Sequence, residues 1–342
     1  MTGRRSRSGP SRRSAQRAAG GTSSLRGGLA LVACLVLGLA VGCSMLPRPS
    51  ARPSHPLENP PPSADLIGRL SFREARAEDT FVDLAVELDV GYVELHAANW
   101  RMDPWLPKAG ALIVVPDAHL LPSGTREGIV INTGDLRLYW FGAGGPRSYP
   151  IGIAKEGFAT PKGTTKVVRK KENPTWYPTA SARRDDPTLA SAVPPGPDNR
   201  LGAFALYLGW PQYLIHGTNE PRGVGRHTSR GCIRLYPEHI QELFALVPVG
   251  TKVRVVHEPV KLGWVGGELY LEVHPDAEQA LALDETGRLE HGPVRDLRKP
   301  VTAAAGRDVA RVDWDGVQRA SYESAGVPVS ITGPREVIRT AF

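Results

Sequence analysis

The stretch LIHGTNEPRGVGRHTSRGCIRL, residues 214–235, decides the fold of this chain more than any other. It opens with a strand-like run that ends at His216, and sixteen residues later Cys232 lies in a polar turn after a glycine. A nucleophilic thiol needs a base within hydrogen-bond reach, and an imidazole that forms an ion pair with the thiolate lowers the thiol pKa. The pattern therefore indicates a cysteine that attacks an acyl carbon. A structural histidine beside a buried cysteine is the alternative.

The residues around this stretch predict a mainly β domain. Turn chemistry at Thr133–Asp135 joins the β-forming runs 129–132 and 136–141 into a hairpin. The other strand-like runs, with frequent Gly and Pro between them, are 148–153, 164–169, 203–208, 213–216 and 251–256. One helix is predicted at 237–246, with Pro in its first turn and an apolar face. These elements indicate a β-sandwich or partial barrel with one packed helix.

The string HGTN…SRGCIRL resembles the active-site signature of the L,D-transpeptidase (YkuD) family, a histidine followed at a set distance by Ser-x-Gly-Cys-x-Arg. The similarity covers residues 124–258 and includes TPKG at 160–163 and NPTW at 173–176. It implies a YkuD-type catalytic domain that acts on peptidoglycan. Arg230 stands where many members have histidine, so no role is assigned to a second histidine.

The resemblance implies a role for each matching residue. Cys232 matches the nucleophile, His216 the base, and Gly217 the residue whose backbone carbonyl orients the imidazole. Gly231 would supply an oxyanion amide together with Cys232. The implied substrate-binding residues are Ser229, Arg230, Arg234 and Asn219.

Several of these residues have a second interpretation. Arg234 could brace the loop through a salt bridge, because arginine forks often do so. Asn219 could close an Asx turn instead of contacting substrate. His227 competes as a base, but no motif position requires it, and it is expected to be a solvated lid residue. Cys232, His216 and His227 could ligate zinc, but the segment places no carboxylate base, so no metal site is predicted.

The N-terminal segment, residues 1–42, is predicted to be a lipoprotein signal peptide. It holds seven arginines and no acidic residue, so the formal net charge of +7 lies entirely in this segment and does not indicate a nucleic-acid partner. The apolar run 29–40 is too short to span a bilayer of about 30 Å. It is followed by Ala40-Val41-Gly42-Cys43, which resembles a lipobox and implies cleavage before Cys43 and lipidation of its sulfur. An ordinary cleaved signal is the alternative.

Cysteine usage supports the interpretation of Cys232. The chain has three cysteines. Cys34 would leave with the signal peptide and Cys43 would carry lipid, so Cys232 would be the only free thiol of the exported protein. Ser44 after the lipidated cysteine implies sorting to the outer membrane. The expected location is therefore the periplasm, with a lipid anchor at Cys43 that holds the protein at the outer membrane.

Residues 43–64 are predicted to be a Pro-rich tether, because they hold seven prolines and no apolar periodicity. Residues 65–121 are predicted to form a small βααβ unit with helices after Thr80 and at 92–99 and a strand at 111–115. This unit resembles a LysM domain, which implies affinity for N-acetylglucosamine chains. A plain packing module is the alternative, since fold resemblance alone does not carry function.

Residues 260–342 are predicted to form a C-terminal subdomain with a strand at 268–273 and a helix that starts near Ala303. The segment ELYLEVHP and the LysM-like unit resemble the envelope-anchored, ErfK-type branch of the family.

The resemblance implies a peptidoglycan L,D-transpeptidase that needs no cofactor. Cys232 would attack the diaminopimelate–D-alanine bond of a tetrapeptide stem, release D-alanine and pass the acyl group to an amine. That amine would belong to diaminopimelate of another stem or to a lysine of the murein lipoprotein. Water as the acceptor would make the protein an L,D-carboxypeptidase. A non-catalytic, LysM-anchored wall-binding lipoprotein is the alternative from a different class.

Overall fold

The computed structural model describes residues 59–155, 157–292 and 295–333. The predicted signal peptide, Cys43 and most of the predicted tether lie outside the described residues. Within the described ranges, no helix is long and apolar enough to cross a membrane.

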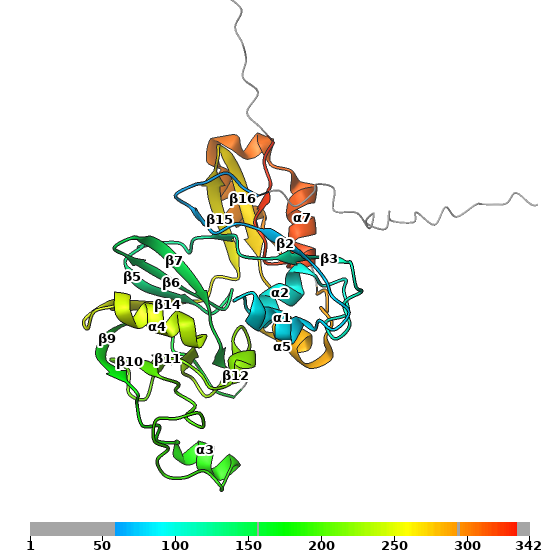
Figure 1. Cartoon of the computed structure of the whole chain (residues 1–342). Coiled ribbons are helices and arrows are strands. Elements are labelled where there is room, and N and C mark those ends of the chain that lie inside the picture. Colours follow the sequence, from blue (N-terminus) through cyan, green and yellow to red (C-terminus); the bar gives the residue numbers. More distant parts are fainter. Residues whose placement is uncertain (1–58, 156, 293–294, 334–342) are drawn as a thin grey trace, which may run out of the picture. The chain divides into compact units, whose positions relative to one another are not determined.

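An eight-stranded mixed sheet forms the centre of the predicted catalytic domain, in the order β13-β11-β10-β9-β14-β5-β6-β7 (Figure 1). Its strands are β5 (Gly128–Asn132), β6 (Arg137–Gly142), β7 (Gly145–Pro150), β9 (Gly163–Glu172), β10 (Phe204–Leu208), β11 (Leu214–His216), β13 (Ile233–Arg234) and β14 (Lys252–Val256). The predicted hairpin is the β5–β6 pair, with Ile129 opposite Trp140. The domain is mainly β, as the sequence predicted.

The ten-residue strand β9 joins the two halves of this sheet. Its first part pairs with β14, from Gly163 opposite Val255 to Lys166 opposite Lys252, and its second part pairs with β10 up to Glu172 opposite Phe204. A strand that changes partners along its length makes a corner and lets the sheet curl. The remaining short pair in this region is β8 (Ile153–Ala154) with β12 (His227–Ser229).

Helix α4 (Pro237–Leu246) has the predicted bounds and covers part of the sheet. Proline in its first turn needs no hydrogen bond there, and Ile240 and Leu243 are buried. The ring of Phe244 lies 4.9 Å from that of Phe204 on β10. Two short helical segments, α3 (Ala180–Asp185) and the 3-10 turn η1 (Pro221–Gly223), were not predicted.

The region 65–121 contains a strand-helix-helix-strand arrangement of β2 (Ser71–Glu74), α1 (Phe81–Glu87), α2 (Tyr92–Ala98) and β3 (Leu112–Val115). β2 and β3 pair antiparallel, and β1 (Leu66–Ile67) pairs with β4 (His119–Leu120). Thr80 caps α1 by accepting a hydrogen bond from the Asp83 amide at 3.2 Å. We call residues 65–121 the N-terminal unit. Its assignment as a LysM domain stays a prediction.

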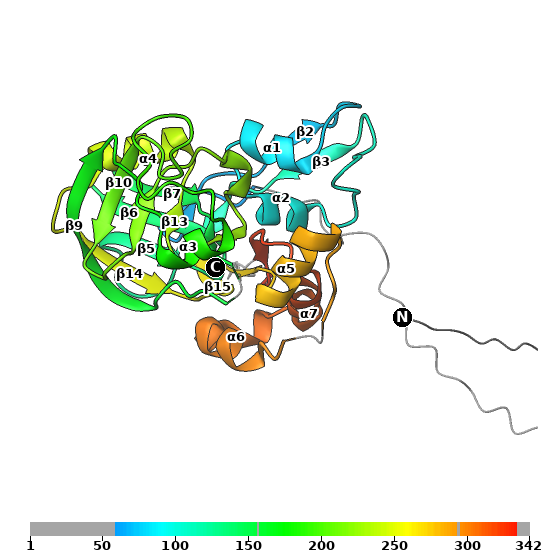
Figure 2. The same ribbon diagram turned by 90° about the horizontal axis from the view of Figure 1, so that it is seen from below.

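The C-terminal region has a three-stranded sheet of β15 (Val260–Val265), β16 (Glu268–Val273) and β17 (Val329–Ser330). Its helices are α5 (Ala277–Thr286), α6 (Arg298–Ala305), the 3-10 turn η2 (Gly306–Arg311) and α7 (Trp314–Glu323). β16 has the predicted bounds, and α6 and α7 share a second hydrophobic core with this sheet (Figure 2). The helix predicted to start near Ala303 was wrong: α6 ends at Ala305, because Gly306 adopts a positive φ of 53°.

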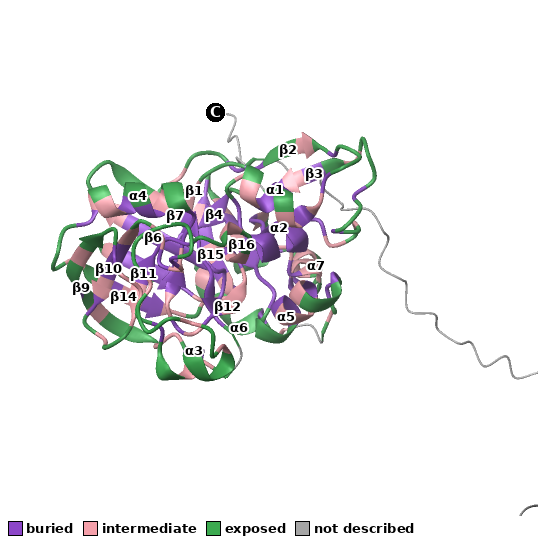
Figure 3. Ribbon diagram, turned by 60° about the horizontal axis from the view of Figure 1, so that its bottom comes forward, coloured by how far each residue is buried: buried purple, intermediate pink, exposed green. Residues whose placement is uncertain are grey.

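The main hydrophobic core is continuous between the N-terminal unit and the catalytic sheet. One buried cluster includes Phe81 and Leu95 of the N-terminal unit, Ile129 of β5, Ile215 of β11 and Leu283 of α5. Figure 3 shows buried stretches on many of the sheet strands and on α2. The sequence predicted separate domains at 65–121 and 124–258, but the buried residues of the two pack together as one core.

Candidate active site

The sheet brings His216 and Cys232 together. β11 and β13 are parallel neighbours, with Ile215 opposite Ile233 and His216 opposite Arg234. Cys232 immediately precedes β13, two residues before Arg234, the partner of His216. Neighbouring strands lie about 4.8 Å apart. Strand pairing thus brings His216 and Cys232, which are sixteen residues apart in the sequence, to neighbouring strands.

The imidazole of His216 is held by backbone carbonyls. Its side chain is buried, with the residue 3% exposed, and Nδ1 lies 2.6 Å from the Gly217 carbonyl oxygen. A carbonyl only accepts, so Nδ1 carries the proton and Nε2 of the neutral ring is the basic nitrogen. Burial lowers the pKa of His216 to about 4, and the positive charge of Arg234 acts in the same direction. Hydrogen bonds to the Gly217 and Leu201 backbone oppose this shift.

The thiol of Cys232 faces a backbone carbonyl as well. Sγ lies 3.5 Å from the carbonyl oxygen of Gln212, to which the S–H donates. Burial raises the pKa of Cys232, while a hydrogen bond from the Leu214 backbone and the charge of Arg234 oppose the shift. Gln212 has a positive φ of 70°, which is rare for a residue other than glycine. This left-handed turn between β10 and β11 aims the carbonyl at the thiol.

Burial favours the neutral form of both groups, in contrast to the thiolate–imidazolium ion pair that the sequence predicted. Burial disfavours the charged form of both groups, raising the pKa of Cys232 and lowering that of His216. At neutral pH the thiol keeps its proton and the imidazole is free to accept it. In such a pair the thiol passes its proton to the imidazole while the sulfur attacks the substrate, and not before the substrate binds.

The turn before the cysteine is fixed by Ser229 and Gly231. Ser229 is 1% exposed; its Oγ donates to the Cys232 carbonyl at 2.6 Å and accepts from the Gly231 amide at 3.1 Å. Ser229 thus braces the turn, and does not line the cleft as predicted. The Gly231 amide is directed at this hydroxyl, so the geometry does not support its predicted role as an oxyanion donor.

Gly231 has a second, steric reason to be glycine. Its φ is 120°, and a Cβ there would lie 2.9 Å from Cε1 of Tyr213 and 3.3 Å from the Ala159 carbonyl oxygen. Both the backbone angle and the close approach exclude larger residues. The Tyr213 hydroxyl also donates to the Ala159 carbonyl at 3.2 Å, so the turn lies against residues 158–160.

Arg230 connects the cysteine turn to two segments that are distant in sequence. Its guanidinium forms an ion pair with Asp185 at the end of α3 and lies 5.0 Å from the centre of the Phe158 ring. The Thr160 hydroxyl donates to the Gly231 carbonyl at 3.2 Å. Sequence reasoning assigned Arg230 to substrate binding and missed Asp185 and Phe158.

Asn219 and Arg234 occupy different environments. Asn219 donates from Nδ2 to the Pro197 carbonyl at 3.0 Å, so it ties loop 217–231 to loop 186–200 instead of closing an Asx turn. Burial lowers the pKa of Arg234, and the charge of Glu220 partly opposes this. Among the described residues no salt bridge to Arg234 is formed, and its buried Nε has no hydrogen-bond partner. The alternative of a bracing salt bridge is therefore not supported.

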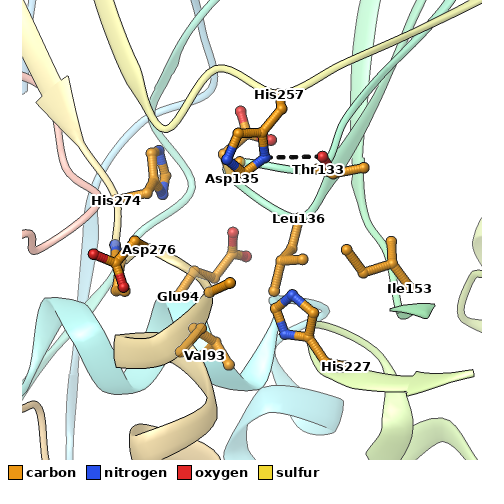
Figure 4. Close-up of a pocket in the computed structure, with 14 residues that line it drawn as sticks. Val93, Glu94, Thr133, Asp135, Leu136, Ile153, His227, His257, His274 and Asp276 are labelled. Atoms are coloured by element: carbon orange, nitrogen blue, oxygen red, sulfur yellow. Dashed lines mark hydrogen bonds between the residues drawn. The ribbon is translucent and has the colours of Figure 1, made fainter. Parts of the chain in front are cut away.

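His227 is a strand residue rather than the solvated lid residue that was predicted. It begins β12, which pairs with β8, and it lines a cavity of about 110 Å³. Figure 4 shows His227, Leu136 and His257 facing this cavity, with His257 hydrogen-bonded to Thr133 at 3.0 Å. Burial lowers the pKa of His227. In the part of the chain that the structure describes, no group of His, Cys, Asp or Glu is placed to hold a metal ion.

Comparison with known proteins identifies related chains. The YkuD family model, described as an L,D-transpeptidase catalytic domain, matches residues 126–255. The chain is 37% identical to "Probable L,D-transpeptidase ErfK/SrfK" of Salmonella typhimurium over 82% of this chain and 92% of that protein. It is 40% identical to "Probable L,D-transpeptidase YbiS" of Escherichia coli over 72% of this chain and 81% of that protein.

A solved structure with some similarity is an L,D-transpeptidase from Mycobacterium smegmatis. It is 20% identical, with a TM-score of 0.32 over 43% of this chain and 63% of that one. This value is too low for a comparison of the two folds.

Proposed function

Because the chain belongs to the L,D-transpeptidase family, we propose that it is a peptidoglycan L,D-transpeptidase with Cys232 as its nucleophile. The observation that carries the proposal is the pairing of β11 with β13, which puts a neutral, backbone-oriented His216 beside Cys232. A neutral imidazole and a thiol in this arrangement can open an amide bond without a cofactor.

In the first half-reaction, Cys232 Sγ attacks the carbonyl carbon of diaminopimelate in the bond to D-alanine. The Sγ proton moves to His216 Nε2, and the carbonyl oxygen becomes an oxyanion. The Cys232 amide is the donor we assign to this oxyanion, because Ser229 accepts the hydrogen bond of the Gly231 amide. Collapse of the intermediate breaks the C–N bond, and the proton on His216 passes to the leaving nitrogen of D-alanine. A thioester on Cys232 remains.

In the second half-reaction, an amine attacks the thioester carbonyl and gives a proton to His216. The C–S bond breaks, a new amide forms, and the proton returns to Cys232 Sγ. The acceptors we propose are diaminopimelate of another stem and a lysine of the murein lipoprotein. Water as the acceptor would make the protein an L,D-carboxypeptidase.

Arg234 is the residue we assign to a substrate carboxylate. It lies opposite His216 in the strand pairing, and its buried Nε has no hydrogen-bond partner among the described residues. A half-buried arginine with an unpaired donor gains from a carboxylate, which its planar fork can bind with two hydrogen bonds.

We also propose that the protein is a periplasmic lipoprotein, anchored through Cys43 to the outer membrane, and that the N-terminal unit binds glycan. The sequence pattern at residues 29–43 and the βααβ order of the N-terminal unit support these proposals. Radiolabelled palmitate incorporation into the unaltered chain, and its loss in Cys43→Ala, tests the anchor.

The catalytic proposal is tested by Cys232→Ala. The unaltered protein should release D-alanine from tetrapeptide muropeptides and form cross-linked or lipoprotein-linked products, detected by mass spectrometry. Cys232→Ala should release none, while still sedimenting with sacculi if the N-terminal unit binds glycan. Equal D-alanine release by both proteins would disprove the catalytic role. No release by either, with sedimentation retained, would favour the non-catalytic wall-binding lipoprotein.

A further inference from the structure

The loop 217–231, which links His216 to Cys232, is held at its centre by the N-terminal unit. The Val93 amide on α2 donates to the Gly225 carbonyl at 3.2 Å. A Cβ added to Gly225 would lie 2.2 Å from the Cα of Gly91, and one added to Gly91 would lie 3.0 Å from the Cα of Gly225. The two backbones are therefore in direct contact, which only a pair of glycines permits.

Side chains strengthen this contact on both sides of Gly225. The guanidinium of Arg226 lies 4.7 Å from the centre of the Tyr92 ring. It also forms an ion pair with Asp284 on α5, which lies outside the N-terminal unit. Arg222 forms an ion pair with Asp83 on α1, at 2.6 Å. The contacts of Arg226 are partly buried, whereas the Arg222–Asp83 pair is exposed to solvent. Arg226 therefore holds the loop more strongly than Arg222 does.

The end of the following strand is attached to the same unit. The Tyr236 hydroxyl lies 2.8 Å from the Val90 carbonyl oxygen and 3.1 Å from that of Ala85, and Tyr236 is 1% exposed. Tyr236 comes two residues after Arg234 of β13. The loop and strand that carry Cys232 are thus fixed to the N-terminal unit at points before and after the cysteine.

We infer that the N-terminal unit is a positioning element of the active site, acting through the Gly91–Gly225 contact and the stacking of Arg226 on Tyr92. This inference rests on the proposed function, because it concerns the geometry of the same His216–Cys232 pair. Both reacting residues end the loop that this contact fixes, so a shift at Gly225 changes their separation. Misplacement of a reacting group by about 1 Å can cost about 100-fold in rate.

Gly91→Val and Tyr92→Leu test the inference from the side of the N-terminal unit. The φ of Gly91 is −77°, so valine is tolerated by the backbone and strains the structure through its contacts with Gly225 and with the Glu94 side chain. Leucine keeps an apolar side chain at position 92 but removes the ring beneath Arg226. We expect both variants to lower kcat for D-alanine release by about 10- to 100-fold. We also expect KM to change less than kcat, and the pH profile of Cys232 alkylation by iodoacetamide to shift.

Two matched variants separate positioning from loss of stability. Tyr92→Phe keeps the ring and removes a hydroxyl that has no hydrogen-bond partner among the described residues, so it should restore both kcat and the alkylation profile. Asn99→Ala removes a side chain that bridges α2 and β3 within the N-terminal unit, through bonds of 2.8 Å to Leu95 and Val114. It should lower the melting temperature without changing the alkylation profile.

The inference is overturned if Gly91→Val keeps the kcat and alkylation profile of the unaltered protein. It is equally overturned if Asn99→Ala, which lowers the melting temperature as much as Gly91→Val, changes kcat and the alkylation profile as much as Gly91→Val does. If the unaltered protein releases no D-alanine, the proposed function fails by itself. The alkylation profile, read by mass spectrometry of the Cys232 peptide, still decides the inference in that case.

Discussion

At the residue scale, the charge state of the His216–Cys232 pair is set by burial. Both groups lie where a charge is poorly solvated, so the histidine stays neutral and the thiol stays protonated at neutral pH. The Gly217 carbonyl fixes the proton on Nδ1, and the Gln212 carbonyl orients the thiol. Backbone atoms, not charged side chains, therefore orient both reacting groups.

The pH dependence of activity follows from this state. His216 acts as a base only when it is neutral, and its pKa is lowered to about 4. We expect kcat/KM for D-alanine release to stay constant as pH falls through 6.5 and to decline only near pH 4. Below that pH a protonated imidazole can no longer accept the thiol proton.

Rates measured between pH 3.5 and 8 check this expectation, after confirmation by circular dichroism that the protein stays folded over that range. His227→Gln is the matched control, because it removes the nearby histidine that we do not place in the mechanism. A decline centred near pH 6.5 that His227→Gln leaves unchanged would contradict the lowered pKa of His216.

At the element scale, α3 and residues 158–160 form a cover next to the cysteine turn that depends on one ion pair. Arg230 links the turn to Asp185 of α3 and stacks on Phe158. The Asp185 carboxylate is exposed, so the pair contributes little to global stability. Its effect is therefore expected on access to the thiol rather than on folding.

Asp185→Asn tests this expectation. We expect faster alkylation of Cys232, by about two- to fivefold at low salt, because loss of an exposed ion pair shifts a local equilibrium only modestly. The difference from the unaltered protein should shrink as salt screens the pair. Asp186→Asn is the control, since the Asp186 carboxylate accepts instead from Thr188. Equal alkylation rates for all three proteins at low salt would show that the Arg230–Asp185 ion pair does not restrict access to the Cys232 thiol.

At the scale of the whole molecule, a buried charge cluster joins the catalytic sheet to the C-terminal strands. Lys261 of β15 lies 2.8 Å from Asp135, in the turn before β6, and 2.8 Å from Glu272 of β16. Glu272 also contacts His119 and His274. The lysine lowers the pKa of both carboxyl groups, most strongly that of Glu272. All of these side chains are buried.

Lys261→Met leaves two buried carboxylates without their cation. We expect a loss of about 3–5 kcal/mol in the free energy of unfolding at pH 7, the usual cost of breaking a buried ion pair from one side. Urea unfolding measures this loss. Lys252→Met is the matched control, because its partner Glu127 is exposed and 3.5 Å away, and it should change stability by less than about 1 kcal/mol.

The sign of the pH effect gives a second measurement on the same variant. The carboxyl groups have lowered pKa values in the folded protein, so their stabilising contribution is present at neutral pH and is lost as pH falls through those values. In Lys261→Met the loss relative to the unaltered protein should therefore be smaller at pH 4 than at pH 7. A loss that is the same at both pH values would indicate that packing, not charge, explains the cost.

Local patterns in the sequence determined much of this molecule. Periodicity and turn residues predicted the β5–β6 hairpin, α4 and β16 at or near their observed bounds, because each depends on residues close in the chain. The motif around Cys232 identified the family, and it predicts Cys232 and His216 as the reacting residues. The helix predicted to start near Ala303 was wrong, because α6 begins at Arg298 and ends at Ala305.

Only the tertiary structure decided the environment of the site and how its parts are joined. The roles of Ser229 and Gly231, the left-handed turn at Gln212 and the link from Arg230 to Asp185 depend on backbone paths that meet from distant segments. The neutral state of His216 depends on how much protein covers it, and burial is a property of the assembled core. The sequence determined which residues can react, and packing determined their charge and what holds them in place.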